Sequence, residues 1–227
     1  MHGIRYFNIH INAEIIMNNI FVVCELEEGK IAYVSLELMT KARSLANQLN
    51  CKLEALVLGH NLAGIEKQLF PFGADVVHVG DSVLLDPYTT LPHTAIIIDL
   101  FKKEQPQIAL MGATTQGRDL GPRVSSALFS GLTADCTSLE IGDHEEKKEN
   151  KLYKNLLYQI RPAFGGNIVA TIINPDCRPQ MATVREGVMK KEIYNPNHVG
   201  EVKMIDVDAI LKPEELVVKV IERHMEK

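Results

Sequence analysis

The sequence predicts an α/β protein in three layers, built on a doubly wound, mostly parallel sheet with an added region of antiparallel strands. Two observations predict the parallel part. Runs of apolar residues such as 53–58 and 108–111 are typical of strands buried on both faces. The segments between such runs repeat apolar residues at spacings of three and four, as amphipathic helices do. Alternating strands and helices with right-handed crossovers place helices on both faces of one sheet.

The predicted elements begin at residue 17, and residues 1–16 are interpreted as an N-terminal extension. A strand at 20–24 and a turn at 27–29 lead into a helix near 35–49, with Ser35 as its predicted N-cap. The elements expected next are a strand at 53–58, a short helix near 61–69, a strand at 76–79, a helix near 90–103, a strand at 108–111 and a helix near 119–130.

The pattern changes after about residue 132. A charged run at 144–151 predicts the tip of a hairpin between extended segments at 137–141 and 154–160. Two further extended segments, 168–173 and 181–184, have short connections, so antiparallel strands are expected beside the parallel core. The tail near 213–226 predicts an exposed helix with Pro213 in its first turn.

Composition excludes several classes of protein. The net charge is −5 without a basic stripe, which argues against nucleic-acid binding. No apolar stretch reaches the roughly 20 residues of a membrane helix, and no signal peptide is recognisable, so a bacterial cytoplasm is expected. The eight histidines and four cysteines lack metal-ligand spacing, and Cys24, Cys51 and Cys136 are predicted to be buried thiols. No catalytic constellation or metal site is predicted.

The densest group of unusual residues is the segment 112–123, between a strand end and a helix start. It contains Thr114, Gly117, Arg118, Asp119 and Arg123. A Gly-rich turn with hydroxyls at a helix N-terminus can hold a phosphate through backbone N–H groups. The segment has neither a P-loop nor the dinucleotide spacing of glycines. A structural interpretation is equally open, with Asp119 as the helix cap and Arg118 paired internally.

Two later segments also gather glycines and arginines. Residues 159–167 include Arg161, Phe164, Gly165 and Gly166, where the two glycines predict a tight turn or bulge and Arg161 precedes a proline on extended backbone. Residues 178–187 place two arginines around a short strand. This could be an anion site, although exposed ion pairs with nearby carboxylates are the commoner outcome.

In this order, the three segments resemble those of electron transfer flavoprotein alpha subunits, the FixB type included. GATTQGRDLGPRVSSALFSGLTADCTSLEI (112–141) is similar to the family's Gly-Ala-Thr turn, its Gly-Arg-Asp-Leu-x-Pro-Arg helix start and its Thr-Gly-Leu-x-Ala-Asp-Cys strand, with Ser130 where Thr is more usual. RPAFGGNIVATI (161–172) and RPQMATVREGVM (178–189) match the two motifs that follow. The resemblance covers roughly residues 17–190.

The resemblance implies a fold similar to adenine nucleotide alpha hydrolases and universal stress proteins. It also implies a heterodimer with a beta subunit that carries electrons through FAD from dehydrogenases, such as acyl-CoA dehydrogenases, to an acceptor. Such a carrier has no catalytic residues of its own. The family holds FAD mainly in a C-terminal domain marked by Gly-Arg-Gly and Gly-x-Ser-Gly-Ala, and neither occurs here. Residues 17–210 are therefore expected to be the N-terminal domain, and 211–227 a helix or linker toward that C-terminal domain.

The resemblance also assigns roles to the site residues. The family's beta subunit holds AMP in the loop equivalent to 112–123, whereas in alpha subunits Thr114, Gly117, Arg118, Asp119 and Arg123 are expected to be structural or interface residues. The 161–166 segment is expected to face the beta subunit and, in flavin-bifurcating relatives, to approach its flavin. The alternative is a stand-alone domain that binds AMP or ATP, similar to universal stress proteins.

Overall fold

The computed structural model describes residues 18–148, 150–163 and 168–222. The predicted N-terminal extension at 1–16, the residues Phe164, Gly165 and Gly166, and the end of the predicted tail helix lie outside the described residues. Residue 149 of the predicted charged run 144–151 also lies outside the described residues, and the other predicted elements can be compared with the structure.

A seven-stranded sheet forms the centre of the molecule, and every pair of neighbouring strands in it is parallel. This confirms the predicted α/β class. From one edge to the other its strands are β12 (Glu201–Met204), β5 (Val76–Asp81), β4 (Leu53–Gly59), β1 (Ile20–Cys24), β6 (Ile108–Gly112), β11 (Gln180–Val184) and β7 (Leu132–Cys136).

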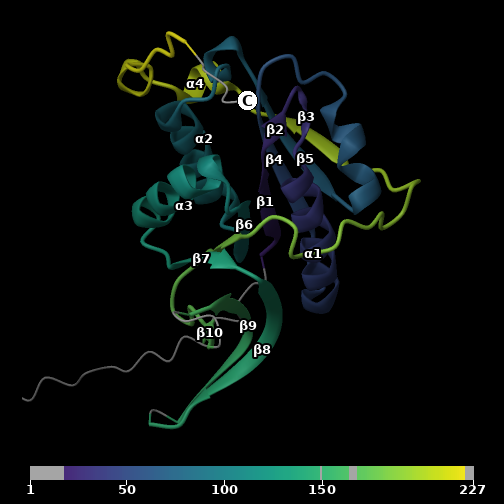
Figure 1. Ribbon diagram of the computed structural model, residues 1–227, viewed down its shortest axis with the longest axis vertical. Coiled ribbons are helices and arrows are strands. Elements are labelled where there is room, and N and C mark those ends of the chain that lie inside the picture. Colours follow the sequence, from purple (N-terminus) through teal and green to yellow (C-terminus); the bar gives the residue numbers. More distant parts are fainter. Residues whose placement is uncertain (1–17, 149, 164–167, 223–227) are drawn as a thin grey trace, which may run out of the picture.

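Helices cover both faces of this sheet (Figure 1). α1 (Tyr33–Leu49) packs on one face, and α2 (Thr90–Glu104) and α3 (Thr115–Ala127) pack side by side on the other. A short helix, α4 (Val207–Ile210), lies next to α2. Single turns of 3₁₀ helix occur at Ile65–Gln68, Phe70–Phe72, Val83–Leu85 and Pro213–Glu215.

Burial on both faces explains why the central strands are apolar throughout. Successive side chains of a strand point to opposite faces, so β1 contributes alternately to two apolar clusters. Ile20, Val22 and Cys24 face α1, whereas Phe21 and Val23 face α2 and α3. Each large apolar side chain buried in this way stabilises the fold by roughly 1.5–3 kcal/mol.

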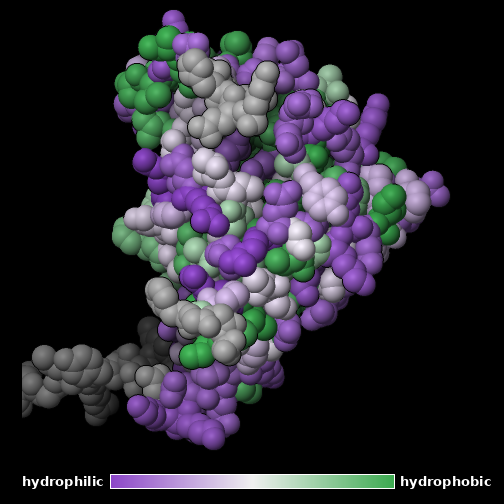
Figure 2. Space-filling model, in the orientation of Figure 1, coloured by the Kyte–Doolittle hydropathy of each residue, from purple (hydrophilic) through white to green (hydrophobic). Residues whose placement is uncertain are grey.

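The predicted antiparallel region is a separate three-stranded sheet in the order β10-β9-β8. Its strands are β8 (Ser138–Glu146), β9 (Lys151–Pro162) and β10 (Val169–Ile172). The sheet projects from the body, below β7 in Figure 1. Hydrophilic side chains cover its far end in Figure 2, which agrees with the predicted charged hairpin tip. A small hairpin of β2 (Leu26–Glu27) and β3 (Lys30–Ile31) forms the predicted turn at 27–29.

The prediction for residues 181–184 was wrong in its partners. This strand, β11, is parallel to β6 and β7 inside the main sheet, and all its residues are buried. A parallel neighbour requires a crossover of a dozen or more residues. Here residues 137–179, which include β8, β9 and β10, form the crossover from β7 to β11. The described residues of this connection contain no helix, so the sequence pattern suggested further antiparallel strands.

Other boundaries also differ from the predictions. The N-cap of α1 is Ala32, and the Ser35 hydroxyl instead accepts a hydrogen bond from the Glu25 backbone N–H at 2.8 Å. The edge strand β12 was not predicted, because its residues are mostly exposed and carry no buried apolar pattern. The predicted tail helix is only one 3₁₀ turn in its described part, and residues 216–222 contain no helix.

Candidate functional site

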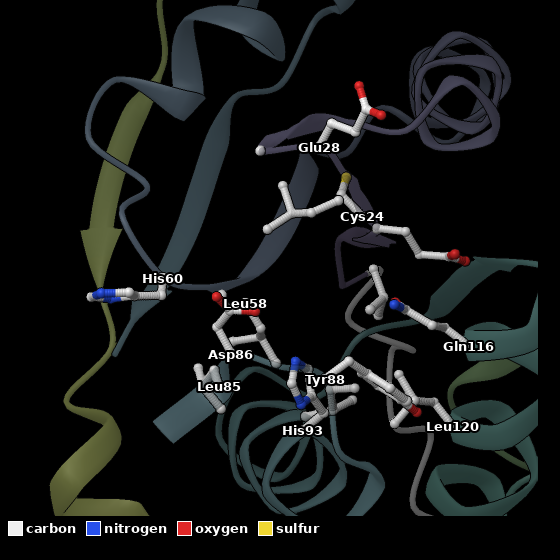
Figure 3. A pocket seen from close by; sticks show the side chains of 16 residues that line it. Cys24, Glu28, Leu58, His60, Leu85, Asp86, Tyr88, His93, Gln116 and Leu120 are labelled. Atoms are coloured by element: carbon white, nitrogen blue, oxygen red, sulfur yellow. The ribbon is translucent and has the colours of Figure 1, made fainter. Parts of the chain in front are cut away.

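A crevice lies at the carboxyl ends of β1, β4 and the segment after β6. In open α/β sheets this is the place where ligands bind, because the connections on either side of the central strand run to opposite faces. Its cavity measures about 280 Å³, and Figure 3 shows Cys24, Leu58, His93 and Gln116 arranged around it.

The segment 112–123 forms the start of α3 at one wall of this crevice. Thr114 is the N-cap, and its Oγ1 accepts a hydrogen bond from the Gly117 N–H at 3.1 Å. The prediction that Asp119 caps the helix was wrong, since α3 begins at Thr115 and Asp119 lies in its second turn. Thr is a good cap, and the Gly-rich sequence after it concealed the helix start.

Gly117 is required for the close approach of α3 to β6. A Cβ atom on Gly117 would lie 1.8 Å from the backbone oxygen of Gly112. Such a contact allows no side chain at all. The structure therefore gives Gly117 a packing role, which agrees with the structural interpretation of this segment.

The carboxylate of Glu25 lies at the N-terminus of α3. The Thr114 hydroxyl lies within hydrogen-bonding distance of both its oxygens, at 2.8 and 2.7 Å. Negative charge is favoured at a helix N-terminus, so this side chain lies where a ligand phosphate would be expected. Burial raises the pKa of Glu25, the Thr114 hydrogen bond opposes that shift, and the charge of Glu186 adds to it.

The rest of the crevice is also unfavourable for an anion. Glu28 and Asp86 line it together with Glu25, and no Lys or Arg is among its lining residues in the described chain. Burial lowers the pKa of His93 to about 4, so this imidazole is neutral at physiological pH. Apart from His60, whose imidazole faces the Asp81 carboxylate at 3.5 Å, the charged side chains of the lining are therefore all carboxylates.

Asp119 and Arg123 belong to a hydrogen-bond network that joins α3 to the start of α2. The Asp119 carboxylate accepts hydrogen bonds from Tyr88 at 2.7 Å and Thr90 at 2.5 Å, and it pairs with Arg123 at 3.5 Å. Burial opposes ionisation of Asp119, but these hydrogen bonds and the Arg123 charge outweigh it and lower the pKa. Both residues tie helices together beside the crevice.

None of the other arginines of these segments is among the crevice-lining residues. Arg185 forms an ion pair with Asp135 at 2.6 Å, and Arg118 approaches the same carboxylate at 3.6 Å. Arg161 lies in β9 on extended backbone, as predicted. Arg178 instead donates to the backbone oxygens of residues 174, 175 and 177, so it does not share an anion site with Arg185.

Metal and disulfide chemistry find no support in the part of the chain that the structure describes. No group of three or more His, Cys, Asp or Glu side chains comes together there. Cys24 and Cys136 are buried free thiols, as predicted, but Cys51 is only half-buried. No helix of the described residues is long and apolar enough to cross a membrane.

Comparison with known proteins identifies the family. Residues 20–210 match the electron transfer flavoprotein domain. This chain belongs to the electron transfer flavoprotein family. The electron transfer flavoprotein subunit alpha of Thermoanaerobacterium thermosaccharolyticum is 44% identical over 190 residues, which are 84% of this chain and 54% of that protein.

Two further relatives show the range of the family. Protein FixB of Clostridium saccharobutylicum is 48% identical over 76% of this chain and 48% of its own length. The acryloyl-CoA reductase electron transfer subunit beta of Anaerotignum propionicum is 39% identical over 89% of this chain and 59% of its own. The chain spans about half the length of the curated relatives it matches. Its similarity to alpha subunits and FixB confirms the resemblance found in the sequence.

Two residues that the sequence did not single out complete these sites. Glu25 follows an apolar strand at the centre of the sheet, and that position is the signal that could have found it. Asp135 lies in the Thr-Ala-Asp-Cys segment, but its arginine partners are 17 and 50 residues away in sequence, so only the fold brings them together.

Proposed function

We propose that this chain is the N-terminal domain of an electron transfer flavoprotein alpha subunit and acts as a scaffold that docks a beta subunit. In this proposal residues 17–210 form the docking domain, and 211–227 lead toward a C-terminal domain that holds most of the FAD. The beta subunit carries AMP. The complex passes electrons from dehydrogenases to an acceptor in a bacterial cytoplasm, and this domain supplies no catalytic residue.

The observation that carries the proposal is the Glu25 carboxylate at the start of α3. A nucleotide-binding domain of this fold uses that helix N-terminus for phosphate. Here a side chain of the protein itself already bonds to Thr114 there, and further carboxylates line the crevice. An incoming phosphate would meet like charge in a partly buried site, which costs free energy.

The family membership supports electron transfer as the process in which the scaffold works. The donors remain part of the proposal. Acyl-CoA dehydrogenases are our preferred class of donor, as the resemblance to alpha subunits implies. One relative is named as an acryloyl-CoA reductase electron transfer subunit, so that relative serves the redox chemistry of a CoA thioester.

The alternative function is AMP or ATP binding by a stand-alone domain similar to universal stress proteins. The position of the 280 Å³ cavity at the switch point favours it. Calorimetry with AMP and gel filtration with a purified beta subunit distinguish the two. We expect a one-to-one complex with the beta subunit and no heat of AMP binding to this chain alone. Tight AMP binding by a chain that forms no complex would favour the alternative.

Arg161 and the segment Phe164, Gly165 and Gly166 are proposed to face the beta subunit and the flavin it carries. The support is the position of Arg161 on β9, in the projecting sheet. Arg161→Ala is expected to weaken the complex and to change the flavin absorption spectrum. An unchanged affinity together with an unchanged spectrum would contradict this assignment.

A further inference from the structure

Asp135 occupies an unusual place in the fold. It is the penultimate residue of β7, where the pairing with β11 shifts register, and its φ of 62° is in the left-handed region. Its backbone N–H donates to the Thr183 hydroxyl at 2.9 Å. Irregularities of this kind redirect a side chain. β7 leads directly into β8, so Asp135 lies in the chain just before the main sheet passes into the projecting sheet (Figure 1).

Arginines from two different elements converge on this carboxylate. Arg185, just after β11, donates through Nη2 at 2.6 Å and Nε at 3.2 Å, a two-pronged geometry that fixes the guanidinium plane. Arg118, on α3, has its Nη2 at 3.6 Å from Asp135 while its Nε donates to the Ala113 backbone oxygen at 2.8 Å. Both arginines are thus oriented before any partner arrives.

Arg161 adds a third positive charge on the adjoining strand: the Thr137 backbone N–H, two residues after Asp135, donates to the Ile160 oxygen at 2.8 Å, and Arg161 follows Ile160. The hydrogen bonds from Arg185 have the largest effect on the pKa of Asp135 and lower it. The charges of Arg185, Arg118 and Arg161 lower it further, and burial opposes them. Among the residues that the structure describes, no ion pair joins Arg161 to a carboxylate. We name Arg118, Arg161, Arg185 and Asp135 the Asp135 cluster. Three positive charges against one negative charge leave it a surplus of two, or of one if the neighbouring Glu186 is counted.

The surplus charge is accessible. The Arg118 and Arg185 side chains are 63% and 50% exposed. In the projecting sheet, Ile168 just before β10 is 63% exposed. Val169 is equally exposed, but it pairs with Pro162 and therefore points to the face opposite Arg161, whose partner on β10 is Ala170. Exposed arginines with a fixed orientation are typical of protein interfaces, where Arg is enriched. The chain as a whole is acidic, with a net charge of −5, so this surface is a local exception.

We propose that the Asp135 cluster is the docking surface for an acidic segment of the beta subunit. This inference rests on the proposed scaffold function. Because Asp135 holds two guanidinium groups in place, carboxylates of the partner can bind them with little further loss of side-chain freedom. Asp135 is a positioning residue in this arrangement, and the arginines make the contacts.

The test is calorimetric titration of the full chain with its beta subunit at 50 and 300 mM NaCl. The double variant Arg118→Gln/Arg185→Gln removes two charges and keeps hydrogen-bonding side chains. Lys103→Gln is the control, because Lys103 is 65% exposed on α2 and pairs with Asp99 within its own helix. We expect the double variant to bind roughly tenfold more weakly at low salt and to lose most of the salt dependence. The control should stay within about twofold.

Asp135→Asn provides a second measurement. It leaves the three arginines in place but removes the charge that orients Arg118 and Arg185, so weaker binding with retained salt dependence is expected. Thermal unfolding verifies that each variant is folded. If wild type binds and the double variant binds equally well with the same salt dependence, the cluster is not the docking surface, and the scaffold function survives. If wild-type chain forms no complex, both proposals fail.

Discussion

Gly117→Ala tests whether the first turn of α3 is built for close packing against the end of β6. The added methyl group would lie 1.8 Å from the Gly112 backbone oxygen and 2.9 Å from its carbonyl carbon. Both are main-chain atoms of the β6 strand end, which cannot rotate away as a side chain could. The start of α3 would have to move outward, and the hydrogen bond from the Gly117 N–H to Thr114 would be disturbed.

The size of the effect follows from two opposing contributions. Replacing Gly by Ala inside a helix stabilises by about 1 kcal/mol. Overpacking a tight contact costs about 1–3 kcal/mol, and a clash with backbone belongs at or above the upper end. The net loss should be about 2 kcal/mol. For a domain of this size that corresponds to a fall in melting temperature of roughly 4–8 °C.

Gly121→Ala is the matched control, since it lies in the same helix and has the same gain in helix propensity. Its Cβ would lie 3.2 Å from a Leu132 side-chain atom and 3.3 Å from a Thr183 methyl group, contacts that small shifts can relieve. Urea and thermal unfolding of both variants should show Gly121→Ala close to wild type and Gly117→Ala well below it. Equal stability of the two variants would refute the packing role of Gly117.

Three more substitutions test the charged and capping groups. Burial raises the pKa of Glu25 above its ordinary value, so the stability contributed by its protonated form is present at acidic pH and is lost as the pH rises through the folded-state pKa. Urea unfolding should therefore find Glu25→Gln more stable than wild type at pH 7 and equal to it near pH 4. A variant less stable than wild type at pH 7 would contradict this. His78→Leu removes the imidazole that lies 2.5 Å from the buried Glu54 carboxylate and leaves the Asn19 amide as its hydrogen-bond donor, so a loss of about 3–5 kcal/mol in urea unfolding is expected. Adding Glu54→Leu should recover most of the loss; a double variant as unstable as the single one would argue against the pairing. Thr114→Val removes the α3 cap and the hydroxyl that bonds Glu25, so a loss of about 1 kcal/mol or more is expected by thermal unfolding, and no loss would mean that the cap contributes nothing.

The strands and helices of the first half were predictable because each carries its own periodic pattern. Strand β4 is buried on both faces and is a continuous apolar run, and α1 repeats apolar residues at helical spacing. The start of α3 was misplaced, because the glycines of 112–121 resemble loop residues until their close approach to β6 is known. Helix propensities describe single residues and contain no information about a contact with a neighbouring strand.

Which strands pair with one another was harder to predict from the sequence. β11 has the length and composition of either a parallel or an antiparallel strand, and only its place between β6 and β7 buries all of its residues. The candidate sites depend on the same long-range information. Glu25 reaches Thr114 across 89 residues, and Asp135 reaches Arg185 across 50.

By itself, the sequence determined the α/β class, the order of most elements and the family, because local periodicity and three collinear motifs are properties of the chain alone. Tertiary structure decided which charges meet. It placed a carboxylate at the helix start where this fold can hold phosphate, and it gathered arginines from α3, β9 and the segment after β11 at the Asp135 cluster. Electrostatic interactions depend on distance in space, and for residues far apart in sequence only the packed fold sets that distance.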